Sequence, residues 1–235
     1  MSDIRAVFFD VFGTLVDWRT SVVQQGPKIT FGKNTEIDWE QFADEWRGMY
    51  QPSMESVRSN LRDWVSLDTL HRESLNVLIK RHGLTALTKY EIEELNRIWH
   101  RLIPWPDTVD GLHKIRQHYI IAPMSNGNIA LMTNLSKHSG LPWDVILGAE
   151  IARQYKPRPE VYLAGASALD LQCSECVMVA AHNDDLRAAR KIGFKTAFIP
   201  RPTEYGRDQK TDLEAEEAWD FTAANLLDLA NRLKA

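Results

Sequence analysis

The first strongly apolar stretch of the chain is short and lies near its start, at residues 6–9 (Ala-Val-Phe-Phe). A continuous apolar run of this length is typical of a strand buried on both faces, as in a parallel sheet. The run ends at a carboxylate, Asp10, followed by Gly13, which permits a tight turn, and Thr14, which offers a hydroxyl. Ligands of open α/β sheets bind at the carboxyl ends of the strands, so Asp10 is expected at a candidate site. The alternative is an ordinary turn or N-cap aspartate.

Between residues 18 and 102 the apolar positions change to helical spacing. Three stripes predict three amphipathic helices, and they consist of Trp39, Phe42, Trp46 and Met49, then Leu67, Leu70, Leu75, Leu78 and Ile79, then Ile92, Leu95, Ile98, Trp99 and Leu102. The second helix is expected to stop at His82-Gly83 and the third before Pro104. A helical block inserted directly after the first strand is best interpreted as a cap domain.

From residue 108 onward, short apolar runs alternate with helical patterns. The runs at 120–124, 145–147, 177–181 and 195–199 predict strands, and the stretches 112–119, 129–138, 162–169, 186–192 and 223–233 predict helices. This alternation indicates right-handed βαβ units and a doubly wound parallel sheet, a Rossmann-like α/β fold. We therefore expect an α/β core domain from residues 1–17 and 103–235 and a helical cap domain from residues 18–102.

Composition narrows the class of protein without naming a function. The chain has 235 residues, of which 44% are apolar and 26% are charged, as expected for a soluble globular protein. A net charge of −4 gives no basic footprint and argues against nucleic acid as a partner. We find neither a signal-peptide pattern nor a membrane-spanning run, so a cytoplasmic protein without membrane association is expected. The Cys173/Cys176 pair has no second pair and predicts a loop before a strand, not a metal or redox site.

Four polar clusters are expected at or just past strand ends: Asp10 with Thr14, Ser125 with Asn126, Lys156, and His182 through Asp185. These ends lie on one edge of a parallel sheet, so the clusters can converge on a single site. Their order, with the helical insertion after the first strand, resembles the haloacid dehalogenase superfamily over essentially the whole chain. The motifs DVFGT, SNG, YKPxxxxY and AAHNDD are similar to those of the type II L-2-haloacid dehalogenases.

The resemblance implies a hydrolase that releases halide from short L-2-haloalkanoic acids, with inversion at C2 and no cofactor. Asp10 would be the nucleophile that forms an ester intermediate, and Lys156 would orient its carboxylate. Thr14 and Ser125 would hydrogen-bond the substrate carboxylate or Asp10, and Asp185 would help to activate the hydrolytic water. Family members are often homodimers, so a homodimer is possible.

The resemblance also suggests residues for the halide and the substrate. Arg47 and Asn126 match halide contacts, Tyr162 matches a tyrosine near the site, and Phe12 would suit an alkyl chain. Three of these residues have a structural alternative. Arg47 could be a solvated arginine on its cap helix, Tyr162 could pack its own helix against the sheet, and Asn126 could form a turn. Ser125 could likewise cap a helix.

One stretch departs from the family pattern. Family members carry Ser-Ser-Asn before the last aspartate, whereas this chain has Ala180-Ala181-His182. The water-positioning network must therefore differ, and His182 either replaces the asparagine or is a satisfied buried histidine.

The main alternative within the superfamily is a Mg²⁺-dependent small-molecule phosphatase. Such enzymes use a second aspartate two residues after the nucleophile, because an alkoxide leaving group needs a proton. Phe12 stands at that position here. Since a halide leaves without a proton, the substitution favours carbon–halogen cleavage. A third possibility, a catalytically idle binding protein, is disfavoured by the presence of Asp10, Lys156 and Asp185 together.

Overall fold

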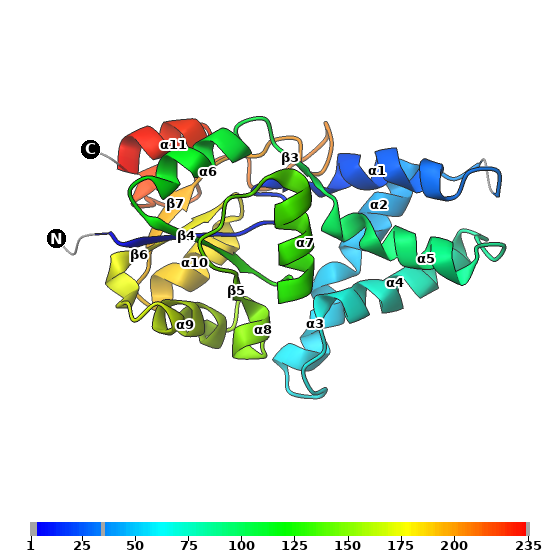
Figure 1. The fold of residues 1–235 in the computed structure, drawn as a ribbon, viewed down its shortest axis with the longest axis horizontal. Coiled ribbons are helices and arrows are strands. Elements are labelled where there is room, and N and C mark those ends of the chain that lie inside the picture. The colour runs from blue at the N-terminus through cyan, green and yellow to red at the C-terminus, as the bar shows by residue number, and fades with distance from the viewer. Residues whose placement is uncertain (1–3, 34–35, 234–235) are drawn as a thin grey trace.

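The computed structural model describes residues 4–33 and 36–233, which form two lobes side by side (Figure 1). One lobe is built on a six-stranded parallel sheet in the order β5-β4-β1-β6-β7-β8. Its strands are β1 (Ala6–Phe9), β4 (Ile120–Ser125), β5 (Leu147–Gly148), β6 (Cys176–Ala180), β7 (Lys195–Phe198) and β8 (Phe221–Thr222). The expected α/β fold is therefore confirmed.

The central strand β1 pairs with β4 on one side and β6 on the other, with Ala6 opposite both Ile120 and Cys176. Its side chains alternate between two faces of the sheet, as strand geometry requires. Val7 and Phe9 pack into the cluster that includes the helices α6 (Thr108–Arg116), α7 (Ile129–Ser139) and α11 (Leu226–Leu233). Ala6 and Phe8 pack into the cluster that includes α9 (Pro159–Ala168) and α10 (Asn183–Lys191). Because both faces are covered, this strand consists of consecutive apolar residues.

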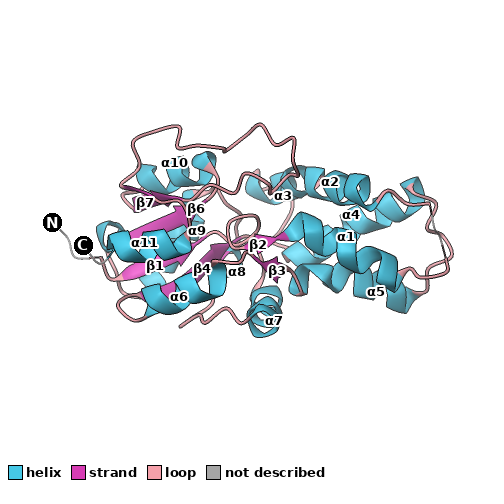
Figure 2. Cartoon of the chain, turned by 90° about the horizontal axis from the view of Figure 1, so that it is seen from above, coloured by secondary structure: helices cyan, strands magenta, loops and turns pink. Residues whose placement is uncertain are grey.

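The helices of this lobe lie on both sides of the sheet, as Figures 1 and 2 show. They are α6 (Thr108–Arg116), α7 (Ile129–Ser139), α8 (Ala149–Ala152), α9 (Pro159–Ala168), α10 (Asn183–Lys191) and α11 (Leu226–Leu233). The other lobe contains α1 (Trp18–Ile29), α2 (Trp39–Gly48), α3 (Tyr50–Arg58), α4 (Leu67–Arg81) and α5 (Lys89–Asn96). The chain passes between the lobes through a two-stranded antiparallel ribbon, β2 (Val16–Asp17) with β3 (Ile103–Pro104).

Several element boundaries differ from the sequence-based expectations. The third cap helix ends at Asn96 and tightens into a 3₁₀ turn over Arg97–His100, so its apolar stripe spans two kinds of helix. The helix expected at 112–119 begins at Thr108 and ends at Arg116. Helices α1 and α3 were not individually predicted, because the buried face of α1 includes Ser21 and Gly26 and the buried face of α3 is short, with Tyr50, Met54 and Val57. We propose residues 18–102 as the cap and residues 1–17 and 103–235 as the core.

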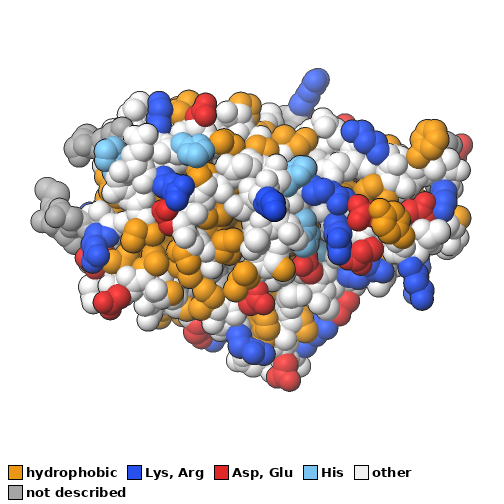
Figure 3. Space-filling model, in the orientation of Figure 1, with side chains coloured by type: hydrophobic (Ala, Val, Ile, Leu, Met, Phe, Trp, Pro, Cys, Tyr) orange, Lys and Arg blue, Asp and Glu red, His pale blue; other side chains and the backbone are white. Residues whose placement is uncertain are grey.

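On the face shown in Figure 3, apolar side chains gather in patches over the α/β lobe with charged and histidine side chains between them, and charges of both signs lie on the helical lobe. None of the helices in the described ranges is both long enough and apolar enough to span a bilayer.

A buried histidine, His71, lies in the aromatic core of the helical lobe. Its ring stacks on Trp99 at 4.2 Å between centroids, and neither ring nitrogen has a hydrogen-bond partner among the described residues. Burial, as the largest cause, lowers the pKa of His71 from 6.5 to about 3. The protein therefore folds around a neutral imidazole.

This burial predicts an acid-sensitive stability. Below pH 6.5 the His71 imidazole is protonated in the unfolded chain, whereas in the folded chain it stays neutral down to about pH 3. Protonation therefore stabilises the unfolded state, and the free energy of unfolding falls as the pH falls from 6.5 to about 3. The loss is on the order of 5 kcal/mol. In urea unfolding at several pH values, His71→Phe is expected to show a shallower fall than the wild type. His113→Phe, on the exposed face of α6, is the control, and equal slopes in both variants would contradict the interpretation.

Candidate active site

A cavity of about 380 Å³ lies where the two lobes meet. The α/β lobe lines it with Asp10, Phe12, Asn126, Lys156, His182 and Asp185, and the helical lobe with Arg47, Tyr50, Gln51 and Arg58. The structure thus brings together most of the residues that the sequence singled out. Ser125, Thr14 and Tyr162 lie behind this lining and act on it through hydrogen bonds.

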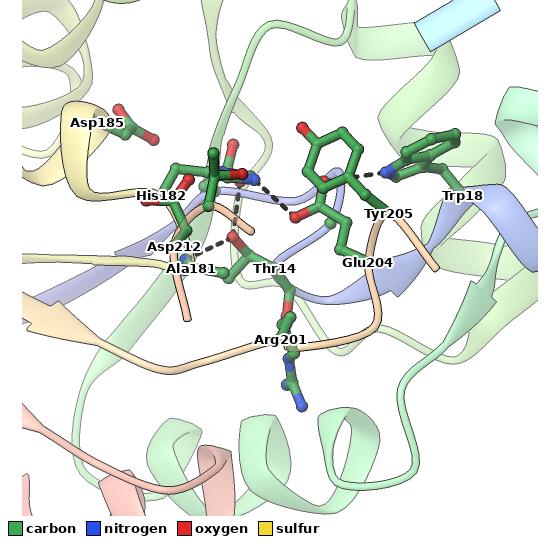
Figure 4. Close-up of polar contacts among 12 residues, drawn as sticks. Thr14, Trp18, Ala181, His182, Asp185, Arg201, Glu204, Tyr205 and Asp212 are labelled. Atoms are coloured by element: carbon green, nitrogen blue, oxygen red, sulfur yellow. Dashed lines mark hydrogen bonds and ion pairs between the residues drawn. The ribbon is translucent and has the colours of Figure 1, made fainter. Parts of the chain in front are cut away.

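Asp10 is positioned by the end of β1. Its backbone N–H donates to Val179 O at 2.9 Å, which aligns it with the neighbouring strand β6. Its Oδ2 accepts a hydrogen bond from Thr14 Oγ1 at 2.7 Å, and that hydroxyl accepts one from Ala181 N at 2.9 Å (Figure 4). Its Oδ1 accepts a hydrogen bond from Lys156 Nζ at 2.8 Å. Both carboxylate oxygens are therefore fixed before any substrate binds.

The charges around Asp10 keep it ionised. Burial alone would raise the pKa of its carboxyl group, but Lys156 and His182 outweigh burial and hold that pKa well below its usual range. The same attraction acts on Lys156, whose pKa is raised by Asp10 and Asp185 against the effect of burial. The pair is therefore a carboxylate and an ammonium throughout the neutral range.

Lys156 is held between two carboxylates. Its Nζ lies 2.8 Å from Asp10 Oδ1 and 2.5 Å from Asp185 Oδ2, and Tyr162 Oη donates to Asp185 Oδ1 at 2.5 Å. Burial raises the pKa of Asp185 more than Lys156 lowers it, and the nearby charge of Asp10 adds to the rise. Tyr162 therefore supports Asp185 from its own helix, α9.

The location of Lys156 corrects one sequence-based expectation. It was expected at a strand end, but it lies in the connection between α8 and α9, and β5 ends earlier, at Gly148. Its place is fixed by its backbone N–H, which donates to Asn126 Oδ1 at 2.8 Å. Asn126 thus connects the end of β4 to the lysine, while Ser125 Oγ accepts a hydrogen bond from Gly127 N at 3.1 Å and stabilises the same turn.

On the opposite wall, Arg47 of α2 points into the cavity. Its guanidinium carbon lies 4.4 Å from the centroid of the Tyr50 ring and 5.4 Å from that of Trp18. One of its nitrogens, Nη1, is buried and has no hydrogen-bond partner among the described residues. A buried, unpartnered N–H group of a cation is suited to receive an anion.

Phe12 and His182 also line the cavity on the side of the α/β lobe. Phe12 is buried and meets the rings of Tyr50 and Trp99 edge-on, at 6.2 and 5.7 Å between centroids. His182 Nδ1 lies 3.2 Å from Asp10 Oδ2. Burial alone would lower the pKa of His182, but Glu204 and Asp10 raise it well above its usual value. Among residues 4–33 and 36–233, no cluster of His, Cys, Asp and Glu has the arrangement of a metal site.

Comparison with known proteins identifies the family of this fold and site. The family model for haloacid dehalogenase-like hydrolases matches residues 4–193. The chain belongs to that family. This hydrolase is 27% identical to (S)-2-haloacid dehalogenase 4A from Burkholderia cepacia, over 96% of this chain and 98% of the relative. It is 28% identical to (S)-2-haloacid dehalogenase 1 from a Pseudomonas species, over 87% and 89%.

Solved structures agree with the sequence relatives. The hydrolase superposes on a defluorinating L-2-haloacid dehalogenase with a TM-score of 0.96 and 46% identity, covering 99% of this chain and 96% of the other. A second L-2-haloacid dehalogenase gives a TM-score of 0.94 at 46% identity, covering 98% and 99%. The family resemblance inferred from the motifs is confirmed.

Sequence reasoning missed the contribution of the long connection between β7 and β8 in this hydrolase. That segment brings Arg201, Glu204, Tyr205 and Asp212 to the side of the site (Figure 4). Arg201 Nε donates to Thr14 O at 2.9 Å, and its guanidinium also pairs with Asp107 at 2.7 Å. The segment has no apolar period to mark it. Its position directly after a parallel strand was the available signal, because such loops border ligand sites.

Proposed function

We propose that this hydrolase cleaves the carbon–halogen bond of short L-2-haloalkanoic acids and releases a 2-hydroxy acid and halide. The observation that carries the proposal is the state of Asp10. It is an ionised carboxylate at the end of β1, facing a cavity of about 380 Å³, with Lys156 and Thr14 holding its two oxygens. A fixed, ionised carboxylate beside a small cavity is a suitable nucleophile for displacement at carbon.

In the proposed first step, one oxygen of Asp10 attacks C2 from the side opposite the halogen. The C–halogen bond breaks as the C–O bond forms, which inverts C2 and gives an ester of Asp10. Arg47, with its unpartnered Nη1, is the proposed halide contact, and Asn126 is a second candidate from across the cavity. Thr14 and Ser125 are proposed to orient Asp10 and the neighbouring turn.

The environment of Phe12 favours this reaction over phosphate transfer. A phosphatase of this superfamily would need a proton donor at that position for its alkoxide leaving group, whereas a halide ion leaves without one. Phe12 is buried against Tyr50 and Trp99 and presents an apolar floor suited to a short alkyl chain. In addition, the Lys156 ammonium already lies between Asp10 and Asp185, which offsets their charge.

The comparisons support the same substrate class. The sequence relatives are named (S)-2-haloacid dehalogenases, and the two solved structures at 46% identity are named L-2-haloacid dehalogenases. One of these is described as defluorinating, which makes fluoroacetate a substrate worth testing here.

A homodimer and a cytoplasmic location are also proposed. The exposed apolar residues Ile151 and Leu163, 41% and 45% exposed, lie on the packed helices α8 and α9 and would suit contact with a second copy. Size-exclusion chromatography with light scattering distinguishes a dimer from a monomer.

The decisive assay measures halide release from both enantiomers of 2-chloropropionate and from fluoroacetate, with EDTA present. We expect chloride from the L-enantiomer and essentially none from the D-enantiomer, with D-lactate as the product of inversion. A generic phosphomonoester with Mg²⁺ is assayed in parallel. Metal-dependent phosphate release without halide release would contradict the proposal and favour the phosphatase.

A further inference from the structure

Glu204 is a buried carboxylate beside the site that the proposed first step does not use. It is 1% exposed and lies in the connection between β7 and β8. Trp18 Nε1 donates to its Oε1 at 3.0 Å, and Arg47 Nη2 lies 3.5 Å from the same oxygen. Its Oε2 lies 2.9 Å from His182 Nε2 (Figure 4). The helical lobe therefore fixes one oxygen, and the other faces the histidine.

The turn after β1 leaves room for the Glu204 carboxylate at Gly13. Gly13 has φ of +88°, and a Cβ placed on it would lie 2.1 Å from Glu204 Oε1. Any larger residue at this position would displace the glutamate as well as strain the backbone. Gly13 thus has a second role besides forming the turn after β1.

His182 lies between Glu204 and the nucleophile. Its Nε2 faces Glu204, and its Nδ1 lies 3.2 Å from Asp10 Oδ2. Asp185, in contrast, contacts Asp10 only through Lys156, since its oxygens accept from Lys156 and Tyr162. Of these two candidates for water activation, His182 is the one that directly faces the carboxyl group of Asp10.

We propose that His182 accepts the proton of the water that hydrolyses the Asp10 ester, and that Glu204 is the positioning residue that holds His182 for this step. The proposal rests on the proposed function, because it concerns the second half of that reaction. Glu204 accepts a hydrogen bond from Nε2–H, which leaves the lone pair on Nδ1, as the carboxylate does in a Ser-His-Asp triad.

The step balances without a further reactant. The water oxygen bonds to Cγ of Asp10 while one water proton passes to His182 Nδ1. The bond between Cγ and the Asp10 oxygen that had attacked C2 then breaks, and His182 returns its proton to this leaving alkoxide, which gives the 2-hydroxy acid with a hydroxyl oxygen that came from Asp10. The second water proton stays on the regenerated carboxyl group of Asp10 and is lost to solvent, because Lys156 and His182 keep that group ionised.

Ester formation also prepares His182 for this role. In the free enzyme His182 lies between two carboxylates, those of Asp10 and Glu204. Esterification removes the negative charge of Asp10 and with it one of the two partners that favour the protonated imidazole. Esterification therefore lowers the pKa of His182, and the Nδ1 proton that Asp10 no longer attracts passes to solvent, so that Nδ1 can accept the proton of the hydrolytic water.

The test separates the two half-reactions with Glu204→Gln. Mixed rapidly with L-2-chloropropionate, this variant is expected to release halide in a single-turnover burst and then to turn over about 100-fold or more slowly than wild type. Mass spectrometry of the quenched protein should show a propionate group on Asp10. His182→Asn should show the same accumulation, and the double variant should be no slower in ester hydrolysis than His182→Asn alone.

The matched control is Glu214→Gln, an exposed glutamate in the same connection, which should behave as wild type. If Glu204→Gln folds, by circular dichroism, but slows the burst and the turnover equally without ester, Glu204 has only a structural role and the proposal is overturned. Independent effects in the double variant would also overturn it. If the wild type itself releases no halide, the proposed function fails and this proposal fails with it.

Discussion

Asp10→Asn is expected to lower halide release from L-2-chloropropionate by at least about 10⁴-fold, because the variant lacks the nucleophile of the covalent step. The amide is nearly the same size as the carboxyl group, so it can still accept the hydrogen bond from Thr14 Oγ1 that the structure shows at 2.7 Å. A loss of this size would therefore report on chemistry and not on misfolding.

Two further measurements make the Asp10 result specific. Asp110→Asn, on an exposed position of α6, is the matched control and should retain wild-type activity. Single turnover of the wild type in ¹⁸O-labelled water should introduce the label into Asp10 and not into the first product, because water attacks Cγ of the ester. Label in the first product, or residual turnover within about 10-fold of wild type, would mean that water attacks C2 directly.

The sequence predicted the parts of the structure that depend on local pattern. Consecutive apolar residues at 6–9 predicted a strand buried on both faces, and the structure places that strand, β1, between β4 and β6. Asp10 and Ser125 could then be assigned to one edge, since each ends or follows a strand. The roles given to these residues came from the family resemblance, because spacing alone does not distinguish a nucleophile from a turn aspartate.

The parts that were missed depend on contacts between distant segments. Glu204 meets Trp18 across 186 positions of sequence, and its segment has no period that indicates where it goes. Tyr50 begins α3 and lines the cavity, whereas Trp46, on the same stripe as other core residues, packs against Trp99 inside the helical lobe. A helical stripe predicts that such residues are buried, but only packing decides which of them faces the site.

Lys156→Met is expected to lower dehalogenation at neutral pH by about 100-fold or more, because the variant removes the ammonium that orients Asp10. Methionine keeps a similar length without the charge. Lys156 is the main cause that lowers the pKa of Asp10 against burial, so its loss should raise that pKa. Asp185 loses the same partner, and the two buried carboxylates then compete for a single negative charge.

The sign of the pH dependence follows from this shift. Asp10 must be ionised to attack carbon, so the acid limb of kcat/KM should move to higher pH in Lys156→Met, with partial recovery of activity as the pH rises. In the wild type, the lowered pKa of Asp10 contributes stability above its unfolded pKa and loses it as the pH falls. The variant should lack this contribution and unfold about 3–5 kcal/mol more easily at neutral pH, the usual cost of breaking a buried pair.

Lys114→Met, on an exposed position of α6, should change neither the profile nor the stability and serves as the control. An acid limb that stays in place in Lys156→Met, with activity reduced equally at every pH, would mean that the lysine only fills space. If the acid limb of kcat/KM moves to higher pH and the halide burst is intact at high pH, Lys156 instead acts by keeping the Asp10 carboxyl group ionised. The second outcome is expected, because Lys156 touches both carboxylates of the site while its backbone is held separately by Asn126.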